Sequence, residues 1–379
     1  MRILLLGEYS RLHNSLKEGL VQLGHEVIIV GDGDDFKDYP VDFSIDAKFS
    51  KSKPIVYFRR LIHRLFKYDF AKTERGIRFY FLLKRLKKFD VVQLINESAI
   101  KTTAGFEIFL LKKIIQQNKK LFLLSCGTDA VCMQYMVDKK FKYSTLTPYF
   151  ESENRSNIYH YMFEYLSKSH LKLHHFLYKN IKGVIASDMD YAIPLEGNSK
   201  FLGLIPNPIN TKKIVFKELV IEDKIIIFLG INRHSYQRKG LDLFEKAFES
   251  IEKTYSNKVK IIKVENLPYH EYSLVLDQSH IVLDQAYAYD QGYNALEAMA
   301  KGKVVFTGAE QEFLDFYQLK ERVAINALPD LNELVKELSF LIENPHEIIK
   351  IGKNARNFIE KEHDYVKIAE KYTETWNSN

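Results

Sequence analysis

Residues 281–305 read IVLDQAYAYDQGYNALEAMAKGKVV, and this stretch has the pattern that is most informative about the fold. It begins with a short apolar run, 281–284, which has the length and composition of a buried strand. Gly292 then precedes a helix-period segment that ends near Gly302, and a second apolar run follows at 304–307. A strand, turn, helix and strand in this order predict a parallel β-α-β unit.

The same alternation extends through the rest of the chain. Short apolar runs separated by helix-period segments indicate a parallel sheet covered on both faces. The predicted strands lie at 2–6, 26–30, 91–95, 121–125, 183–186, 224–229, 258–264, 281–284 and 304–307. Two such series in succession predict an α/β fold of two Rossmann-like, doubly wound parallel-sheet domains that face a cleft.

A domain boundary is predicted within Leu204-Ile-Pro-Asn-Pro-Ile-Asn210, because two prolines around an asparagine resist helix formation. We therefore expect an N-terminal domain at 1–208 and a C-terminal domain at 209–361. The segment 135–180 has no clear strand and is expected to be helical. The end of the chain is also helical by pattern, and a helix at about 362–379 is expected to pack back on the first domain.

Composition narrows the class of protein. The 379 residues are 46% hydrophobic and 27% charged, which is typical of a globular chain long enough for two domains. Two cysteines, Cys126 and Cys132, cannot form a disulfide framework or a four-ligand zinc site. The start lacks a signal-peptide pattern, and no apolar run reaches the roughly 18 residues that span a bilayer. We expect a cytoplasmic protein, peripheral at the inner face of the plasma membrane if it binds lipid.

The 51–88 segment concentrates positive charge. Its thirteen basic residues are opposed by only Asp69 and Glu74, and apolar residues interleave with the basic ones at helical spacing. Three interpretations remain open: an ordinary amphipathic helix, an anionic membrane surface, or nucleic acid. Of the two external partners, we favour the membrane surface and expect no nucleic-acid partner.

Loops after predicted strands carry the candidate binding residues, because ligands bind beyond the carboxyl ends of parallel strands. The loop after 224–229 holds Arg233 and Lys239 just before a helix, where a diphosphate would meet cations and free N–H groups. The loop after the first predicted strand contains Gly7 but lacks the two further glycines of the G-x-G-x-x-G motif that binds a dinucleotide. This argues against a nicotinamide or flavin dehydrogenase.

The loop after 281–284 combines three features of a nucleotide site. Gly292 lets the backbone approach a ligand closely, and the N–H groups near Tyr293 and Asn294 begin a helix without intrahelical partners. Glu297 lies one turn further, where its carboxylate can accept both hydroxyls of a ribose. This spacing predicts a nucleotide site at 290–297.

The run NALEAMAKGKVV at 294–305 resembles the donor-site signature of retaining GT-B glycosyltransferases, broadly those of family 4. GHEV at 24–27, PNPIN at 206–210 and the Arg233, Lys239 pair fit the same pattern in the same order. The resemblance implies that Arg233 and Lys239 bind the donor diphosphate, that Gly292 contacts phosphate or sugar, and that Glu297 holds the ribose.

One position departs from that signature. The acid that contacts the transferred sugar in the family would fall at Tyr289, so Asp290 or Asn294 is expected to supply the polar contact. The family's proline before the following strand is also absent, because Lys303 leads directly into the apolar run.

Three residues of the first domain are candidates for catalysis. His13 lies after the first strand, where inverting relatives keep a general base; it could equally be a surface or helix-start histidine. Asp129 follows another strand in CGTD, 126–129, where it could contact a sugar or cap the next helix. Glu97 ends a third strand, where the family often has histidine.

The resemblance implies transfer of a sugar from a UDP- or GDP-sugar to a saccharide or lipid-linked acceptor in surface polysaccharide or glycolipid synthesis, with retention. No covalent cofactor or obligatory metal is expected; Asp188-Met-Asp190 has metal-motif spacing but is expected at a helix start away from the cleft. Two other functions remain open: a nucleotide-sugar epimerase of the same fold, and a non-catalytic subunit that binds a sugar nucleotide.

Overall fold

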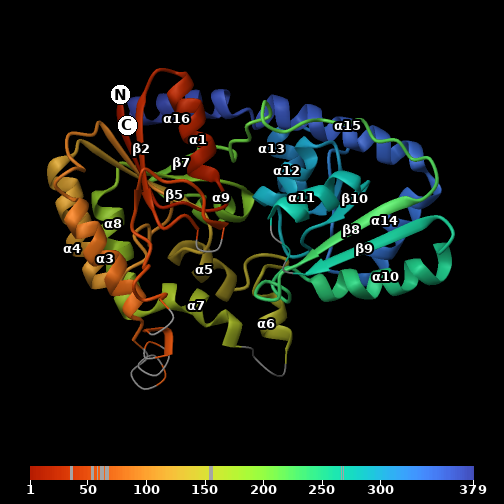
Figure 1. Cartoon of the computed structure of the whole chain (residues 1–379), viewed down its shortest axis with the longest axis horizontal. Helices are drawn as coiled ribbons and strands as arrows, with labels where there is room; N and C mark the ends of the chain where they lie inside the picture. Colours follow the sequence, from red (N-terminus) through yellow and green to blue (C-terminus); the bar gives the residue numbers. More distant parts are fainter. Residues whose placement is uncertain are drawn as a thin grey trace.

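The computed structural model describes residues 1–34, 37–52, 55–57, 59, 64, 68–152, 157–265, 267 and 269–379. Within them, two separate parallel sheets form the centres of two α/β domains that lie side by side (Figure 1). The first sheet has the strand order β3-β2-β1-β4-β5-β6-β7, and the second has the order β12-β11-β10-β8-β9. The structure therefore confirms the predicted fold class of two doubly wound parallel-sheet domains.

The N-terminal sheet forms from the apolar runs predicted for it, and its inner strands β4 and β6 are buried at every residue. Its strands are β1 (Arg2–Leu6), β2 (Glu26–Gly31), β3 (Phe43–Ser44), β4 (Val91–Leu94), β5 (Lys120–Ser125), β6 (Gly183–Ala186) and β7 (Phe201–Leu204). The edge strands β3 and β7 were absent from the prediction, because two or four half-buried residues give no clear apolar run.

Helices surround this sheet and extend from it toward the second domain. Helix α4 packs against both α3 and α8, whereas α5 packs against α9. The helices are α1 (Leu12–Gln22), α3 (Phe70–Leu82), α4 (Ala104–Gln117), α5 (Ala130–Val137), α6 (Thr147–Glu151), α7 (His160–Phe163), α8 (Lys168–Asn180) and α9 (Met189–Leu195). The predicted helical segment 135–180 is largely helical in its described residues, apart from the turns at 138–146, and α6 and α7 lie beneath the junction of the domains (Figure 1).

The C-terminal domain repeats the pattern on a smaller scale. Its strands are β8 (Ile225–Ile231), β9 (Val259–Glu265), β10 (Ile281–Leu283), β11 (Val304–Thr307) and β12 (Ile325–Asn326). Its helices are α10 (Leu241–Tyr255), α11 (Tyr269–Gln278), α12 (Tyr293–Ala300), α13 (Gln311–Tyr317), α14 (Leu331–Glu343) and α15 (Pro345–Glu362). Helix α10 packs on α14 and α12 packs on α15, so the sheet is covered on both faces.

The last helix, α16 (Tyr365–Ser378), crosses back to the N-terminal domain and packs against α1 (Figure 1). Trp376 is fully buried there and its Nε1 donates to Oε1 of Gln93 at 3.0 Å. Gly19 permits this contact, since a Cβ at that position would lie 2.1 Å from the carbonyl oxygen of Tyr365. The two domains are thus joined at the linker and again through α16. Among the helices of the described residues, none has the length and apolar character needed to cross a bilayer.

Candidate active site

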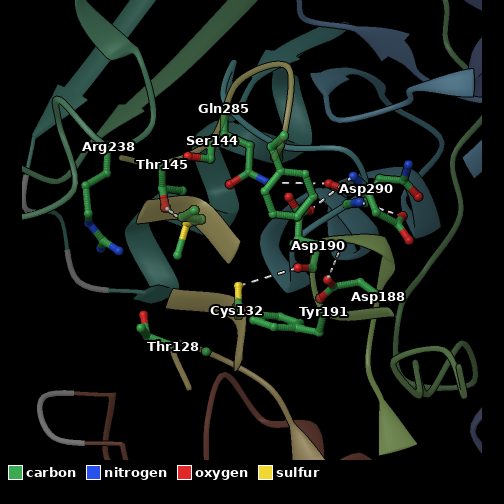
Figure 2. Close-up of a pocket in the computed structure, with 16 residues that line it drawn as sticks. Thr128, Cys132, Ser144, Thr145, Asp188, Asp190, Tyr191, Arg238, Gln285 and Asp290 are labelled. Carbon is green, nitrogen blue, oxygen red and sulfur yellow. Dashed lines mark hydrogen bonds between the residues drawn. The ribbon is translucent and has the colours of Figure 1, made fainter. Parts of the chain in front are cut away.

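A cavity of about 190 Å³ lies between the two domains, where the carboxyl ends of β5, β6 and β10 approach each other (Figure 2). The N-terminal domain contributes the loops after β5 and β6 and the start of the helical segment. The C-terminal domain contributes the loop after β10 and one residue before α10. The lining residues are Gly127, Thr128, Cys132, Met136, Phe141, Ser144, Thr145, Asp188, Asp190, Tyr191, Arg238, Gln285, Ala288, Asp290, Gln291 and Gly292.

Gly292 brings a helix N-terminus to this cavity. It is the N-cap of α12 and has extended backbone dihedrals, and no side chain caps the helix there. The first-turn N–H groups of a helix lack intrahelical acceptors and carry partial positive charge. The wall at Gly292 is therefore suited to an anionic group such as a phosphate.

Arg238 supplies a cation to the same cavity, which the sequence prediction missed. Its Nε is buried without a hydrogen-bond partner among the described residues, and its guanidinium carbon lies 5.6 Å from the ring centroid of Tyr161 on α7. The only sequence signal was its position in the loop that also holds Arg233 and Lys239. A buried donor of this kind is suited to pairing with an anionic ligand.

The two cations that the sequence predicted for this loop lie outside the cavity lining. Lys239 donates from Nζ to Oδ1 of Asp284 at 2.7 Å. The other oxygen of Asp284, Oδ2, has no partner within the described residues. It lies 3.9 Å from the point that a Cβ on Gly292 would occupy, so Asp284 holds Lys239 near the start of α12. Arg233 is exposed and pairs with Glu265 at 2.7 Å.

Three carboxyl groups stand at the opposite end of the cavity from Arg238, with Asp290 buried and Asp188 and Asp190 half-buried (Figure 2). Asp190, in the N-terminal domain, accepts hydrogen bonds from the backbone N–H groups of Tyr289 and Asp290 at 3.2 and 3.3 Å. Asp290 accepts in return from the N–H of Met189 at 3.1 Å. Each domain therefore caps the backbone of the other at this seam.

The third carboxyl group, Asp188, caps α9 by accepting from the N–H of Asp190 at 3.1 Å. The expectation that Asp188 and Asp190 lie away from the cleft is wrong, because the end of β6 meets the loop after β10 across the domain junction. Burial raises the pKa of Asp290 to about 6 and also raises the pKa of Asp188 and Asp190. Within the described part of the chain, no group of three metal-ligating side chains is placed to hold an ion.

Tyr289 occupies the position where the family signature has an acid, and its side chain serves the domain contact. Its hydroxyl oxygen accepts from the backbone N–H of Lys142 at 2.9 Å. Its ring lies 5.0 Å from that of Phe141 and 5.5 Å from that of Tyr143, measured between centroids. The phenol is thus engaged with the N-terminal domain and does not line the cavity.

The remaining predicted donor residues lie on α12, beyond the cavity lining. The Tyr293 hydroxyl contacts Oγ of Ser15 at 2.5 Å and donates to the carbonyl oxygen of Pro208 at 3.1 Å. Asn294 is exposed and Glu297 is half-buried one turn into the helix. Of the donor set, Asp290 and Gly292 line the cavity, and Gln285 joins them as a residue that the sequence prediction did not name.

Part of the C-terminal half, and the fold of the whole chain, have counterparts among known proteins. Residues 238–374 match a protein family described as glycosyl transferase-like. Sucrose-phosphate synthase from Thermosynechococcus elongatus is similar across 100% of this chain and 98% of its own, with 16% identity and a TM-score of 0.63. No curated protein matches the sequence.

Two further solved structures share the arrangement. HepE from Anabaena, in complex with UDP and glucose, covers 100% of both chains with 12% identity and a TM-score of 0.62. A protein assigned as a UDP-N-acetylglucosamine 2-epimerase from Listeria monocytogenes covers 98% of this chain and 94% of its own, with 12% identity and a TM-score of 0.53.

The chain has the GT-B fold. Within this fold, residues 238–374 form a glycosyl transferase-like region.

In this GT-B chain, His13 lies in the first turns of α1 and is fully buried. Its Nδ1 is 2.7 Å from the carbonyl oxygen of Gly7, and its Nε2 has no partner among the described residues. Burial lowers the pKa of His13 to about 4, so the ring is neutral near pH 7. His13 does not belong to the cavity lining.

Asp129 and Glu97 lie behind the cavity wall of the GT-B chain. Asp129 caps α5, accepting from the N–H of Cys132 at 2.7 Å and from the hydroxyl of Ser125. Burial raises the pKa of Asp129 to about 6. Two roles were predicted for Asp129, a sugar contact and a helix cap; in the structure Asp129 caps α5.

Glu97 lies between two histidines of α8, with Nε2 of His170 at 2.8 Å and Nδ1 of His174 at 2.6 Å. Burial opposes its charge, but hydrogen bonds from both histidines lower the pKa of Glu97. The adjacent Asn96 donates from Nδ2 to the carbonyl oxygens of Cys126 and Thr128, at 2.7 and 2.9 Å. Asn96 therefore helps to fix the conformation of the loop at 126–128, part of which lines the cavity.

Proposed function

We propose that the chain transfers a sugar, with retention of configuration, from a UDP- or GDP-sugar to a saccharide or lipid-linked acceptor. The observation that carries this proposal is the interdomain cavity, in which the N-terminus of α12 and the guanidinium of Arg238 border the same space. Both groups favour a diphosphate. The run at 294–305 further supports membership of family 4.

The proposed donor lies along the C-terminal domain. Its diphosphate meets Gly292 and Arg238, with Lys239 held nearby through Asp284. The ribose reaches Glu297, one turn into α12. Arg233 joins the diphosphate when its ion pair with Glu265 is exchanged for the ligand. As the sugar–phosphate bond breaks, negative charge grows on the leaving diphosphate, and these cations stabilise it.

The acceptor approaches from the N-terminal wall of the cavity. Thr128, Ser144 and Thr145 present hydroxyl groups there, which suit the hydroxyls of a saccharide. The 51–88 segment supports a lipid-linked acceptor at the inner face of a plasma membrane, although ten of its positions lie outside the described residues. We propose that no covalent cofactor or obligatory metal takes part, and that water is excluded by closure of the domains.

Binding and turnover together test this function. We expect UDP or GDP to raise the unfolding temperature, because a ligand bound only by the folded state stabilises it. A screen of UDP- and GDP-sugars with saccharide acceptors should yield a product that contains both. Glu297→Gln should weaken binding of the nucleoside, whereas Glu312→Gln, outside the proposed site, is the matched control. Absence of binding to every nucleotide would refute the proposal.

An epimerase is the second candidate, supported by its shared fold and by the three carboxyl groups at the cavity. None of the residues that line the described cavity is a histidine, whereas the epimerases require histidines as well as acids in the cleft. Incubation with a nucleotide sugar alone separates the two: an epimerised donor without acceptor indicates the epimerase. Tight binding without conversion, with or without acceptor, indicates a binding subunit.

A further inference from the structure

We propose that the outer face of α3 and α4 is a docking surface for an anionic lipid membrane. This inference goes beyond the transfer reaction, because it concerns a surface away from the cavity. Both helices lie on the side of the N-terminal domain that faces away from the C-terminal domain (Figure 1). The surface consists of an aromatic cluster and a set of basic side chains beside it.

The aromatic cluster is exposed although its rings are large. Phe81 is 74% exposed and Tyr80 is 49% exposed, and Ile77 and Phe109 are also exposed. The ring of Tyr80 stacks on that of Phe109 with centroids 6.2 Å apart, and lies 6.0 Å from that of Phe81. Apolar area of this size, left in water and contiguous across two helices, marks an interaction surface.

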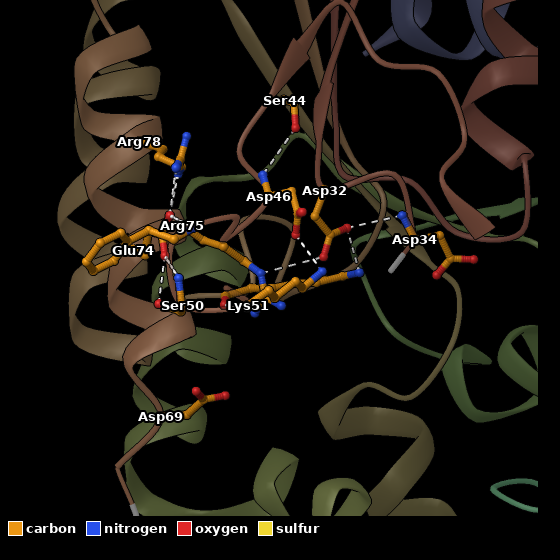
Figure 3. A network of polar contacts seen from close by, with 12 residues as sticks. Asp32, Asp34, Ser44, Asp46, Ser50, Lys51, Asp69, Glu74, Arg75 and Arg78 are labelled. Atoms are coloured by element: carbon orange, nitrogen blue, oxygen red, sulfur yellow. Dashed lines mark hydrogen bonds and ion pairs between the residues drawn. The ribbon is translucent and has the colours of Figure 1, made fainter. Parts of the chain in front are cut away.

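The inner face of α3 is set by its buried residues Ala71, Gly76 and Phe79, and polar contacts anchor the helix beside that face. Glu74 accepts from the N–H groups of Phe49 and Ser50 at 3.0 and 2.7 Å and pairs with Arg78, while Arg75 faces Asp32 at 3.6 Å (Figure 3). Positions 77, 80 and 81 project from the side of the helix opposite Ala71, Gly76 and Phe79. The aromatic side chains are therefore held outward by the fold.

Six cations flank the aromatic cluster. Leu83, Leu86 and Phe89 are buried after the end of α3, and the residues between them point into solvent. The exposed cations are Lys84, Arg85, Lys87 and Lys88 after α3, and Lys112 and Lys113 on α4. None of the six forms an ion pair with another residue that the structure describes.

The residues that form this surface include no exposed acid. Residues 77–88 contain no acid, and the only acid of α4, Glu107, is buried and accepts from the backbone N–H of Ile100 at 2.8 Å. Basic side chains beside exposed aromatic rings match the negative surface and apolar interior of an anionic bilayer. Nucleic acid fits less well, because the rings stack on each other and do not present separate faces to bases.

Vesicle co-sedimentation of the full chain tests this surface. We expect binding to vesicles of phosphatidylcholine with phosphatidylglycerol at low salt, weak binding to phosphatidylcholine alone, and loss at high salt. Replacing Lys84, Arg85, Lys87 and Lys88 by Glu should weaken binding about tenfold or more, since each cation contributes near an anionic surface. Tyr80→Ser with Phe81→Ser should also weaken it by about tenfold, while leaving the remaining binding sensitive to salt.

A matched control has the same change of charge in the C-terminal domain. Lys253, Lys258, Lys260 and Lys353 are exposed, and their replacement by Glu should leave vesicle binding within about twofold of the unmodified chain. All variants should keep their circular dichroism spectrum and their turnover with a water-soluble acceptor, which separates this test from that of the transfer reaction. The proposal is overturned if the unmodified chain ignores anionic vesicles, if the control loses as much binding as the α3 variant, or if single-stranded RNA binds the surface in preference to vesicles.

Discussion

The two ends of the interdomain cavity carry opposite charge and differ in how that charge is satisfied. At one end, Asp188, Asp190 and Asp290 accept hydrogen bonds from backbone or hydroxyl donors, several of them across the domain seam. At the other end, Nε of Arg238 is buried without a partner among the described residues. The satisfied end holds the domains together, whereas the unsatisfied end is available to a ligand.

This contrast shows that charge alone does not identify a binding group in this cavity. A buried polar atom without a partner is costly, and a ligand that supplies the partner recovers that free energy. A buried carboxylate that already accepts backbone N–H groups gains less from a ligand. Replacing residues at each end should therefore change different properties of the protein.

The largest effect is expected at the acidic end, in the pH dependence of stability. Burial raises the pKa of Asp290 from 3.8 to about 6, which corresponds to about 3 kcal/mol. Between these values the folded chain holds a proton that the unfolded chain has lost, so this residue's contribution to stability falls as pH rises through that window. Denaturant unfolding should show Asp290→Asn gaining stability relative to the unmodified chain from about pH 4 to about pH 6.

Asp315→Asn, at an exposed position away from the cavity, is the control variant for that measurement. Parallel pH profiles for Asp290→Asn and the unmodified chain would show that the acidic end is not desolvated. Turnover of Asp290→Asn adds a second result: unchanged transfer excludes Asp290 as a substitute for the acid missing at position 289.

An effect of intermediate size is expected at the cationic end. Arg238→Ala should weaken UDP or GDP binding about tenfold or more, about 1.4 kcal/mol, because a charge-assisted contact to the diphosphate is lost. Arg233→Ala should cost less, since that side chain is exposed and already pairs with Glu265. Calorimetry on both variants measures the difference. The opposite order, with Arg233 the more costly, would assign the diphosphate to Arg233 and leave Arg238 to the domain contact with Tyr161.

The smallest effect is expected at Tyr289, beside the acidic end. Tyr289→Phe removes the acceptor for the N–H of Lys142 but keeps the ring contacts with Phe141 and Tyr143, so the loss should be about 1 kcal/mol. Thermal unfolding measures it. Tyr255→Phe, which removes a contact to Glu343 within one domain, is the comparison. If only Tyr255→Phe lowers the unfolding temperature, Tyr289 does not fasten the domains.

The sequence predicted strands and helix starts correctly where a local pattern of residues has a direct physical reason to form them. The nine predicted strands formed because continuous apolar runs must be buried on both faces of a parallel sheet. Gly292 and the helix start at Tyr293 were predicted for a similar reason, since glycine before a helix-period run leaves unpaired N–H groups. The functional roles of Arg233, Lys239, Glu297, His13 and Glu97 stay predictions.

The tertiary structure decided which side chains share a space. Arg238 and Lys239 are adjacent in the sequence, yet only Arg238 lines the cavity. The loop before α10 directs Arg238 toward Tyr161 of α7 and Lys239 toward Asp284 at the end of β10. Asp190 and Asp290 are 100 residues apart and cap each other's domains only because β6 and β10 end at the same seam. Local spacing sets strands, helices and their starts; contacts between domains depend on how two separately formed sheets meet, and no short stretch of sequence contains that information.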